Sequence, residues 1–170
     1  MTVETGVEPA ARPVPATVEE FAACDEADLE IVVPWTGPAI DPTTGALKAP
    51  LPPTYVVATS GGWPKPGAIE VATDLNRVLL EELWRREGLL AATFAISEKC
   101  WMSSRALAVW TDEESLQAFL TSEGHMNAVR RTKNLAYAWE GTRWVSNSPV
   151  LPTFDEVRAR LAEQRKRKRT

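Results

Sequence analysis

The sequence has few of the residues that metal sites require. His125 is the one histidine among 170 residues, and the two cysteines, Cys24 and Cys100, do not form a CxxC pair. A structural zinc site takes four Cys or His ligands, so this count almost excludes one, and no metal is expected. A single disulfide could join the two cysteines, but nothing in the sequence indicates an oxidising compartment.

Long apolar runs and phosphate-binding loops are also missing. No apolar stretch approaches the roughly 20 residues that cross a membrane. The opening residues MTVETGVEPAARPVPA lack the basic and apolar regions of a signal peptide, so we expect a cytoplasmic protein. Ser60-Gly61-Gly62 follows a predicted strand, but it lacks the GxGxxG and GxxxxGK patterns of nucleotide-binding loops.

Charge is unevenly distributed along the chain. The net charge is −4, yet five of the last six residues, 165–170, are basic. The rest of the protein is therefore markedly acidic, which argues against a nucleic-acid-binding domain. The basic tail is interpreted as a solvated terminus. Its alternative is contact with nucleic acid or an anionic surface, which salt would weaken.

The pattern of the central part, residues 54–148, predicts a β-α-β-β-α-β order. Strands are expected at 54–59, 89–97, 101–110 and 136–146, with Ser60-Gly61-Gly62 ending the first and a turn or bulge at 140–142 interrupting the last. Helices are expected at 69–87 and 112–134, the second bending or breaking at Gly124. This order is the α+β, ferredoxin-like arrangement.

The flanking segments differ in character from this core. Residues 1–53 form a Pro-rich arm and strap with one short strand at 29–33, stopped by Pro34, and Trp35 is expected to anchor the strap. Thr17 could cap one short helical turn. Residues 149–170 are predicted to form a C-terminal helix, capped near Thr153, that ends in the basic tail.

Two polar residues are the candidates for chemistry. Histidine gains and loses a proton near neutral pH, so His125 could act as an acid or base. Its alternative is a structural hydrogen bond to a strand or to the helix break. Arg105 lies within an apolar strand, and its charge needs either an ion-pair partner or a solvent-exposed face of the sheet. It could bind an anionic part of a substrate, or it could pair with a glutamate across a dimer interface.

Seven tryptophans against two tyrosines favour a pocket or interface rich in indole. Strand alternation puts Trp101 and Arg105 on one face of their strand and Trp110 on the other. Tryptophan more often fills cores, and Trp110 is expected mainly to pack. The aromatic residues predicted to contact a substrate are Tyr55, Trp63, Trp101, Trp110, Trp139 and Trp144.

One pattern within residues 54–148 comprises Val109-Trp110, Glu113-Glu114, Phe119, Ser122 and Gly124-His125. By these residues, the segment 54–148 resembles the antibiotic biosynthesis monooxygenase-like group of dimeric α+β barrel domains. The resemblance implies a homodimer whose two sheets close into a barrel. A bare apolar sheet face opposite the helices would supply the reason for pairing.

The resemblance also implies a function. The first hypothesis is a tailoring enzyme similar to the cofactor-free monooxygenases or cyclases, acting on a hydrophobic aromatic, polyketide-like intermediate with His125 and Arg105 as its polar groups. Within this class, a haem-binding relative with His125 as the ligand is the alternative. The second hypothesis is a non-catalytic ligand-binding or assembly module, because no complete catalytic set is present. The sequence does not name a substrate.

Overall fold

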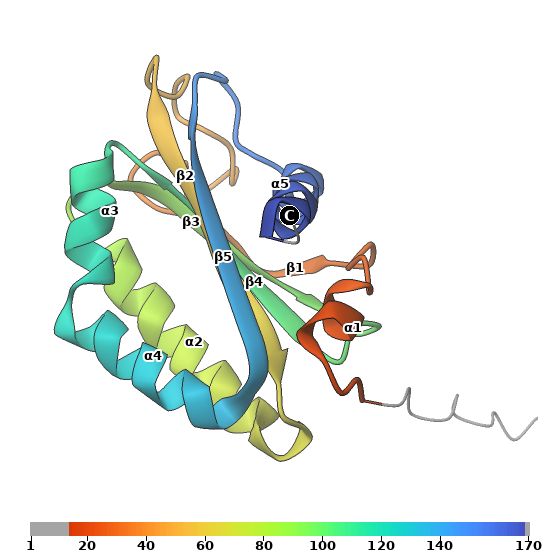
Figure 1. Ribbon diagram of the computed structural model, residues 1–170. Helices are drawn as coiled ribbons and strands as arrows, with labels where there is room; N and C mark the ends of the chain where they lie inside the picture. The colour runs from red at the N-terminus through yellow and green to blue at the C-terminus, as the bar shows by residue number, and fades with distance from the viewer. Residues whose placement is uncertain (1–13, 169–170) are drawn as a thin grey trace, which may run out of the picture.

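The computed structural model describes residues 14–168 and contains an antiparallel five-stranded sheet in the order β1-β3-β4-β2-β5 (Figure 1). The strands are β1 (Glu30–Thr36), β2 (Tyr55–Pro64), β3 (Leu89–Ser97), β4 (Ser103–Trp110) and β5 (Ala136–Ser146). The helices are α1 (Val18–Ala22), α2 (Ile69–Trp84), α3 (Glu113–Leu120), α4 (Glu123–Leu135) and α5 (Phe154–Lys168), with a 3-10 turn, η1, at Pro66–Ala68. Strands β2 to β5 form the predicted ferredoxin-like core, and β1 extends the sheet beside β3. The α+β, ferredoxin-like prediction is confirmed.

Strand β2 continues through Gly61 and Gly62, so the prediction that these glycines end it is wrong. β2 lies between β4 and β5 and pairs with both along this stretch. A Cβ atom at Gly61 would overlap the carbonyl oxygen of Ser104, and one at Gly62 would overlap that of Ala138. Glycine is therefore needed here because the neighbouring backbones come too close for any side chain. Likewise β5 runs without interruption through residues 140–142, and β1 continues past Pro34.

The helix expected at 112–134 breaks close to Gly124, as predicted, and the break divides it into α3 and α4. Asp112 caps α3 by accepting from the Ser115 amide at 2.7 Å, and Ser122 caps α4 by accepting from the His125 amide at 3.3 Å. His125 thus lies in the first turn of α4 and not four turns into a long helix. Gly124 lies against the Glu82 carboxylate of α2, so the first turn of α4 packs beside the C-terminal part of α2.

Helices α2, α3 and α4 cover one face of the sheet (Figure 1). Their apolar side chains meet those of the strands in a core that includes Leu83, Trp110, Leu116 and Phe119. The rings of Trp110 and Phe119 are 5.6 Å apart, centroid to centroid. This contact fixes α3 against the end of β4.

The opposite face is covered by other parts of the same chain. Val157 and Leu161 of α5 pack on Tyr55, Val57 and Trp144 of the sheet, with the strap residues Trp35, Leu47 and Leu51 around them. Phe21 of α1 packs on Trp63 farther along this face. In Figure 1, α5 and α1 lie on the side of the sheet away from α2 and α4. The expected bare face is therefore wrong, because α5 and the strap remove that apolar surface from water. The homodimer remains a prediction, but an exposed apolar sheet face no longer supports it.

Among the residues described, no helix is both long and apolar enough to cross a bilayer.

Candidate functional site

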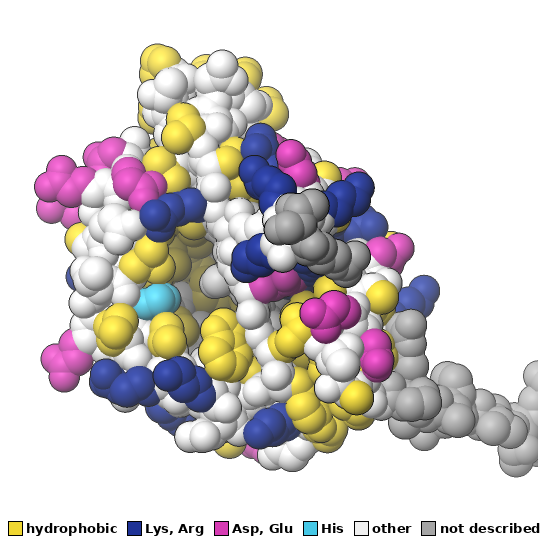
Figure 2. Space-filling view, in the orientation of Figure 1, with side chains coloured by type: hydrophobic (Ala, Val, Ile, Leu, Met, Phe, Trp, Pro, Cys, Tyr) yellow, Lys and Arg dark blue, Asp and Glu magenta, His cyan; other side chains and the backbone are white. Residues whose placement is uncertain are grey.

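A cavity of about 650 Å³ lies between the sheet and helices α2, α3 and α4. Its floor is made of small residues on three adjacent strands: Ala58, Ser60, Gly62, Ser104, Ala106, Ala108 and Gly141. Because side chains on one face of a strand alternate, these positions all project toward the helices. Their small volume leaves the space that larger side chains would otherwise fill. The cavity opens on the face shown in Figure 2, where His125 lies at the edge of the hollow.

The walls of the cavity are largely apolar. They are formed by Leu75, Leu79 and Leu83 of α2, Leu116, Phe119 and Leu120 of α3, Val129 and Leu135 of α4, and Trp110 and Trp139 of the sheet. A concave, mostly apolar site with few polar groups is typical of small-molecule pockets. The volume and lining suit a flat hydrophobic ligand.

His125 is oriented by two local contacts. Its Nδ1 lies 2.9 Å from the carbonyl oxygen of Leu120, and its ring packs on Phe119 with centroids 5.0 Å apart. A carbonyl oxygen can only accept, so Nδ1 carries the proton. In the neutral ring, Nε2 then holds the lone pair and can accept a proton or bind a ligand. The helix break at Ser122 is what places this imidazole on the cavity rim.

An ion pair links two elements that flank the opening. Arg143 of β5 lines the cavity, and its Nη2 lies 2.9 Å from a carboxylate oxygen of Glu113, the first residue of α3. Both side chains are about half exposed. Arg143 is the one cationic side chain in the described cavity lining. The described lining therefore holds one cation, Arg143, paired with Glu113, and one anion, Glu140, paired with Arg105 and Arg165.

The aromatic residues proposed from the sequence divide between the two faces of the sheet. Trp110 and Trp139 line the cavity. The other four lie away from it: Tyr55 and Trp144 pack under α5, while Trp63 and Trp101 surround Phe21. The Tyr55 hydroxyl donates to the carbonyl of Ser148 at 2.8 Å, which fixes the chain between β5 and α5. Those four residues pack the α5 face and do not border this cavity.

Arg105 also lies on the α5 face, opposite the cavity, and its side chain is fully buried. Its guanidinium donates to Glu26 at 2.7–3.1 Å and to Glu140 at 2.9 Å. Glu26 follows α1 in the chain, and Arg165 of α5 binds Glu140 as well. The partner foreseen across a dimer interface is thus supplied within the same chain. With two carboxylates bound, Arg105 acts here as an internal ion-pair centre and does not meet His125.

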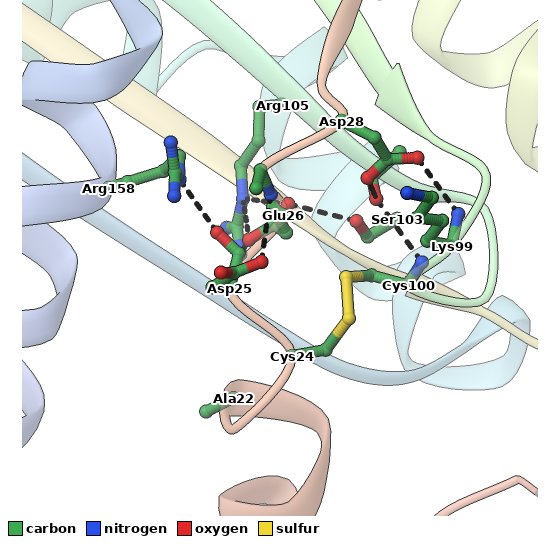
Figure 3. Close-up of a disulfide and its surroundings, with 12 residues drawn as sticks. Ala22, Cys24, Asp25, Glu26, Asp28, Lys99, Cys100, Ser103, Arg105 and Arg158 are labelled. Atoms are coloured by element: carbon green, nitrogen blue, oxygen red, sulfur yellow. Dashed lines mark hydrogen bonds and ion pairs between the residues drawn. A yellow bond between two sulfur atoms is a disulfide. The ribbon is translucent and has the colours of Figure 1, made fainter.

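The segment around Glu26 is held by further bonds, shown in Figure 3. Cys24 and Cys100 form a disulfide that ties this segment to the loop between β3 and β4. The Asp28 carboxylate accepts from the Ser97 hydroxyl and, at 3.0 Å, from the Lys99 amide. Arg158 of α5 donates to the Asp25 carbonyl at 2.7 Å. This part of the expected N-terminal arm is therefore docked, whereas residues 1–13 lie outside the described region.

The charges around Arg105 change the acidity of Glu140. Burial raises the pKa of this carboxyl, but the hydrogen bond from Arg165 and the charges of Arg105 and Arg165 lower it by more. The net pKa lies below the ordinary glutamate value. Glu140 is thus an anion held between two arginines and is poorly suited to accept a proton.

Several polar residues of the cavity were not proposed as site residues from the sequence, among them Ser60, Asn76 and Ser104. The serines lie among the small residues of the floor, and Asn76 is on α2. A signal for the floor was present, since small residues recur at alternate positions in 58–62 and 104–108. Within residues 14–168, no group of three or more His, Cys, Asp or Glu side chains is arranged to hold a metal ion.

The class defined by these features is a ferredoxin-like α+β domain with a ligand-sized cavity between sheet and helices. No protein-family model and no curated protein matches the sequence. Solved structures do match the fold. A candidate monooxygenase from Fusobacterium nucleatum aligns over 73% of this chain and 54% of its own, with 14% identity and a TM-score of 0.53. The chain thus spans about half the length of that protein.

Shorter proteins match over nearly their whole length. A protein from Pseudomonas aeruginosa aligns over 55% of this chain and 94% of its own, with 15% identity and a TM-score of 0.51. An antibiotic biosynthesis monooxygenase aligns over 57% of this chain and 99% of its own, with 20% identity and a TM-score of 0.49. At these identities the likeness is one of fold. The α+β, ferredoxin-like fold that the sequence resemblance implied is shared with these solved structures.

Proposed function

We propose that the protein is a small tailoring enzyme, an oxygenase or cyclase, that acts on a hydrophobic aromatic, polyketide-like substrate. The observation that carries this proposal is the position of His125, whose Nε2 is the free nitrogen of an imidazole on the rim of an apolar cavity. The apolar walls would hold a flat ring system, and the imidazole would supply the proton transfer that enolisation needs.

The reaction that suits this arrangement is the oxidation of an enolised ring by molecular oxygen. Nε2 of His125 accepts a proton from an acidic C–H or O–H group of the substrate, and the resulting enolate is electron-rich. Oxygen is the oxidant and the substrate supplies the electrons. For an anthrone, the methylene group becomes a carbonyl, one oxygen atom enters the product and the other leaves as water.

Haem is the alternative cofactor, and the residues fit it only in part. An imidazole whose Nδ1 is bonded to a backbone carbonyl is typical of a ligating histidine, so His125 could bind iron through Nε2. The haem propionates, however, would need cations. The described lining supplies one, Arg143, which already pairs with Glu113. This donor set favours the reaction without haem.

The test combines turnover with binding. Anthrone and oxygen are added to the wild type and to His125→Ala, and quinone absorbance and oxygen consumption are followed. We expect the wild type to form quinone and His125→Ala to lose at least tenfold in kcat, since positioned general bases contribute about 10²-fold or more. Ala106→Phe, which places a ring on the cavity floor, should abolish both binding and turnover. Asn127→Ala, on the exposed side of α4, is the matched control.

The other hypotheses predict different results. If the protein is a binding module, added anthrone would quench its tryptophan fluorescence, but neither the wild type nor any variant would form quinone. A haem protein would show a Soret band after haemin is added, and the band would disappear in His125→Ala. Equal turnover in wild type and His125→Ala, with both folded by circular dichroism, would show that the imidazole is not the base.

A further inference from the structure

We infer that the rim of the cavity opening docks on an anionic lipid bilayer, with the second half of α4 and the indole of Trp139 against the lipid headgroups. The docking rim consists of Met126, Arg130 and Lys133 of α4 and Trp139 of β5. The inference goes beyond the proposed function, because contact with a bilayer depends on this surface and not on a reaction inside the cavity.

The first observation is a group of cations without counterions. Arg130, Arg131 and Lys133 are exposed, and in the part of the chain that the structure describes none of them forms an ion pair. By contrast, the exposed Arg77 of α2 pairs with Glu81 on its own helix. Helix α4 has one acidic residue, in its first turn, so its second half carries positive charge alone. This surface is therefore complementary to an anionic one.

The second observation is the position of these cations beside the opening. Met126, Val129, Arg130 and Lys133 are three or four residues apart in sequence, so their side chains share one side of α4. Val129 also lines the cavity, so this row of side chains borders its opening. In Figure 2, basic side chains gather along α4 beside the hollow, with apolar side chains between them and the histidine.

The row of side chains faces away from the neighbouring helix. Gly124 lies against the Glu82 carboxylate and so marks the side of α4 that packs on α2. Ala128 and Arg131 follow Gly124 at four and seven residues and share that side. The docking rim lies on the other side of α4, which faces the opening between α4 and β5 and is not covered by α2.

The third observation is an exposed indole across the opening. Trp139 is 47% exposed, the highest exposure class among the seven tryptophans, and it lines the cavity. Chain direction reverses where β5 begins at Ala136. Trp139 is three residues, about 10 Å, along β5 from this point, and Arg130 is six residues, about 9 Å, back along α4. The indole and the cations therefore flank the opening at similar distances from the turn, and Met126 is 44% exposed beside them.

This composition favours a bilayer as the partner. Tryptophan is enriched at the boundary between membrane and water, where its ring lies at the level of the headgroups. Basic and large apolar side chains on one surface are typical of proteins that bind in the plane of that boundary. An acidic protein would match the cations equally well, but it would not by itself account for a half-exposed indole and a half-exposed methionine at the mouth of an apolar cavity.

Carboxylates at the far end of the opening set the orientation of docking. Glu113 and Glu114 lie in the first turn of α3 and would be repelled by anionic lipid. The end of the opening between α4 and β5 therefore contacts the bilayer. An apolar ligand dissolved in the bilayer would then enter the cavity without crossing water, which suits the hydrophobic substrate of the proposed function.

The test measures vesicle binding in the absence of substrate. The protein is mixed with vesicles of phosphatidylcholine alone, or of phosphatidylcholine with phosphatidylglycerol, and the bound fraction is measured by co-sedimentation. We expect the wild type to bind the mixed vesicles only, and less at high salt, since salt screens exposed charges. Arg130→Gln/Lys133→Gln should bind at least about tenfold more weakly, because each cation near an anionic surface contributes about fivefold.

A matched control and a second measurement locate the contact. Lys166→Gln/Lys168→Gln removes two exposed charges from the end of α5 and should bind like the wild type. Lipids brominated on their acyl chains should quench the tryptophan fluorescence of the bound wild type. This quenching should be mostly lost in Trp139→Phe, since the other tryptophans are less exposed.

The outcomes are decided without reference to anthrone turnover. Absence of binding to the mixed vesicles, or equal binding to both kinds of vesicle, overturns the inference. Unchanged binding in Arg130→Gln/Lys133→Gln also overturns it, as does an equal loss in Lys166→Gln/Lys168→Gln, which would assign the contact to the basic tail. Quinone formation would stand by itself if no vesicle is bound, and vesicle binding would stand if anthrone is never oxidised.

Discussion

The Glu26 carboxylate lies directly against the Arg105 guanidinium, with Oε1 2.7 Å from Nη2, on the face of the sheet that α5 covers. Both side chains are almost completely buried, at 3% and 0% exposure. Glu26 also accepts from the Ser103 hydroxyl at 2.9 Å, and its backbone has a φ of +53°, in the left-handed region. A buried charge pair therefore docks the segment that follows α1, and it does so through a residue held in an uncommon conformation.

The first prediction concerns this pair. In Glu26→Ala, Arg105 keeps only Glu140 as a partner in the core, and a buried charge that loses a partner typically costs about 3–5 kcal/mol. Because Glu140 remains, we expect a loss near the lower value, about 3 kcal/mol in the free energy of unfolding by urea. Glu81→Ala, which breaks the exposed pair with Arg77, is the control and should change stability by less than about 1 kcal/mol. Equal effects of the two substitutions would contradict the structural role of Glu26.

The disulfide gives the second prediction. Cys24 and Cys100 are 76 residues apart, and closing a loop of that length stabilises the folded state by about 4 kcal/mol in the chain-entropy model. Reduction by dithiothreitol, or the double serine variant, should lower the free energy of unfolding by about this amount. The sequence has no other cysteine, so the reductant acts at one place. Binding of anthraquinone should persist in the folded reduced protein, because the cavity is on the other face. Loss of binding without loss of stability would contradict this assignment.

The third prediction concerns pH. The pKa of Glu140 in the folded protein lies below its ordinary value of 4.5, because the arginines outweigh the effect of burial. A carboxyl with a lowered folded pKa stabilises the fold above its unfolded pKa, and that contribution is lost as pH falls through the folded value. Glu140→Gln should therefore be less stable than the wild type at neutral pH, and the difference should shrink as the pH falls below about 4.5. Urea unfolding at several pH values measures it, and Glu163→Gln on the exposed side of α5 controls for the loss of one charge.

The ferredoxin-like core was predictable because its signals are local. Alternation along residues 103–110 places Arg105 and Trp110 on opposite faces, and the structure keeps them there. The same alternation argues against a single pocket that contains both Arg105 and the Trp110 side of the strand. The small residues at alternate positions of β2 and β4 were likewise readable as a hollow in the face that packs on the helices.

The contacts between distant segments were not predictable in this way. Phe154, Val157 and Leu161 of α5 pack on the sheet, but charged residues dominate this helix, so its pattern indicates only weakly that it covers a sheet face. Glu26 lies in an acidic stretch with no regular period, and its role depends on an arginine 79 residues away in the sequence. Gly61 and Gly62 have the composition of a turn, but the backbones on either side of β2 require glycine within a strand.

The fourth prediction concerns the ion pair at the cavity opening. Arg143 on β5 and Glu113 on α3 join two elements beside the entrance, and both are about half exposed, so the pair should contribute less than about 1 kcal/mol to stability. Its loss should instead let ligand leave more easily, because the contact between the two walls is gone. In Arg143→Gln we expect faster dissociation of hydroxyanthraquinone in stopped-flow fluorescence, with the urea midpoint nearly unchanged.

Arg77→Gln is the control. It removes an arginine from the exposed pair on α2 and should leave the dissociation rate as in the wild type. High salt should speed dissociation from the wild type toward the Arg143→Gln rate, since salt screens exposed charges. An identical rate in wild type and Arg143→Gln at low salt would show that the ligand leaves by a route that this pair does not restrict.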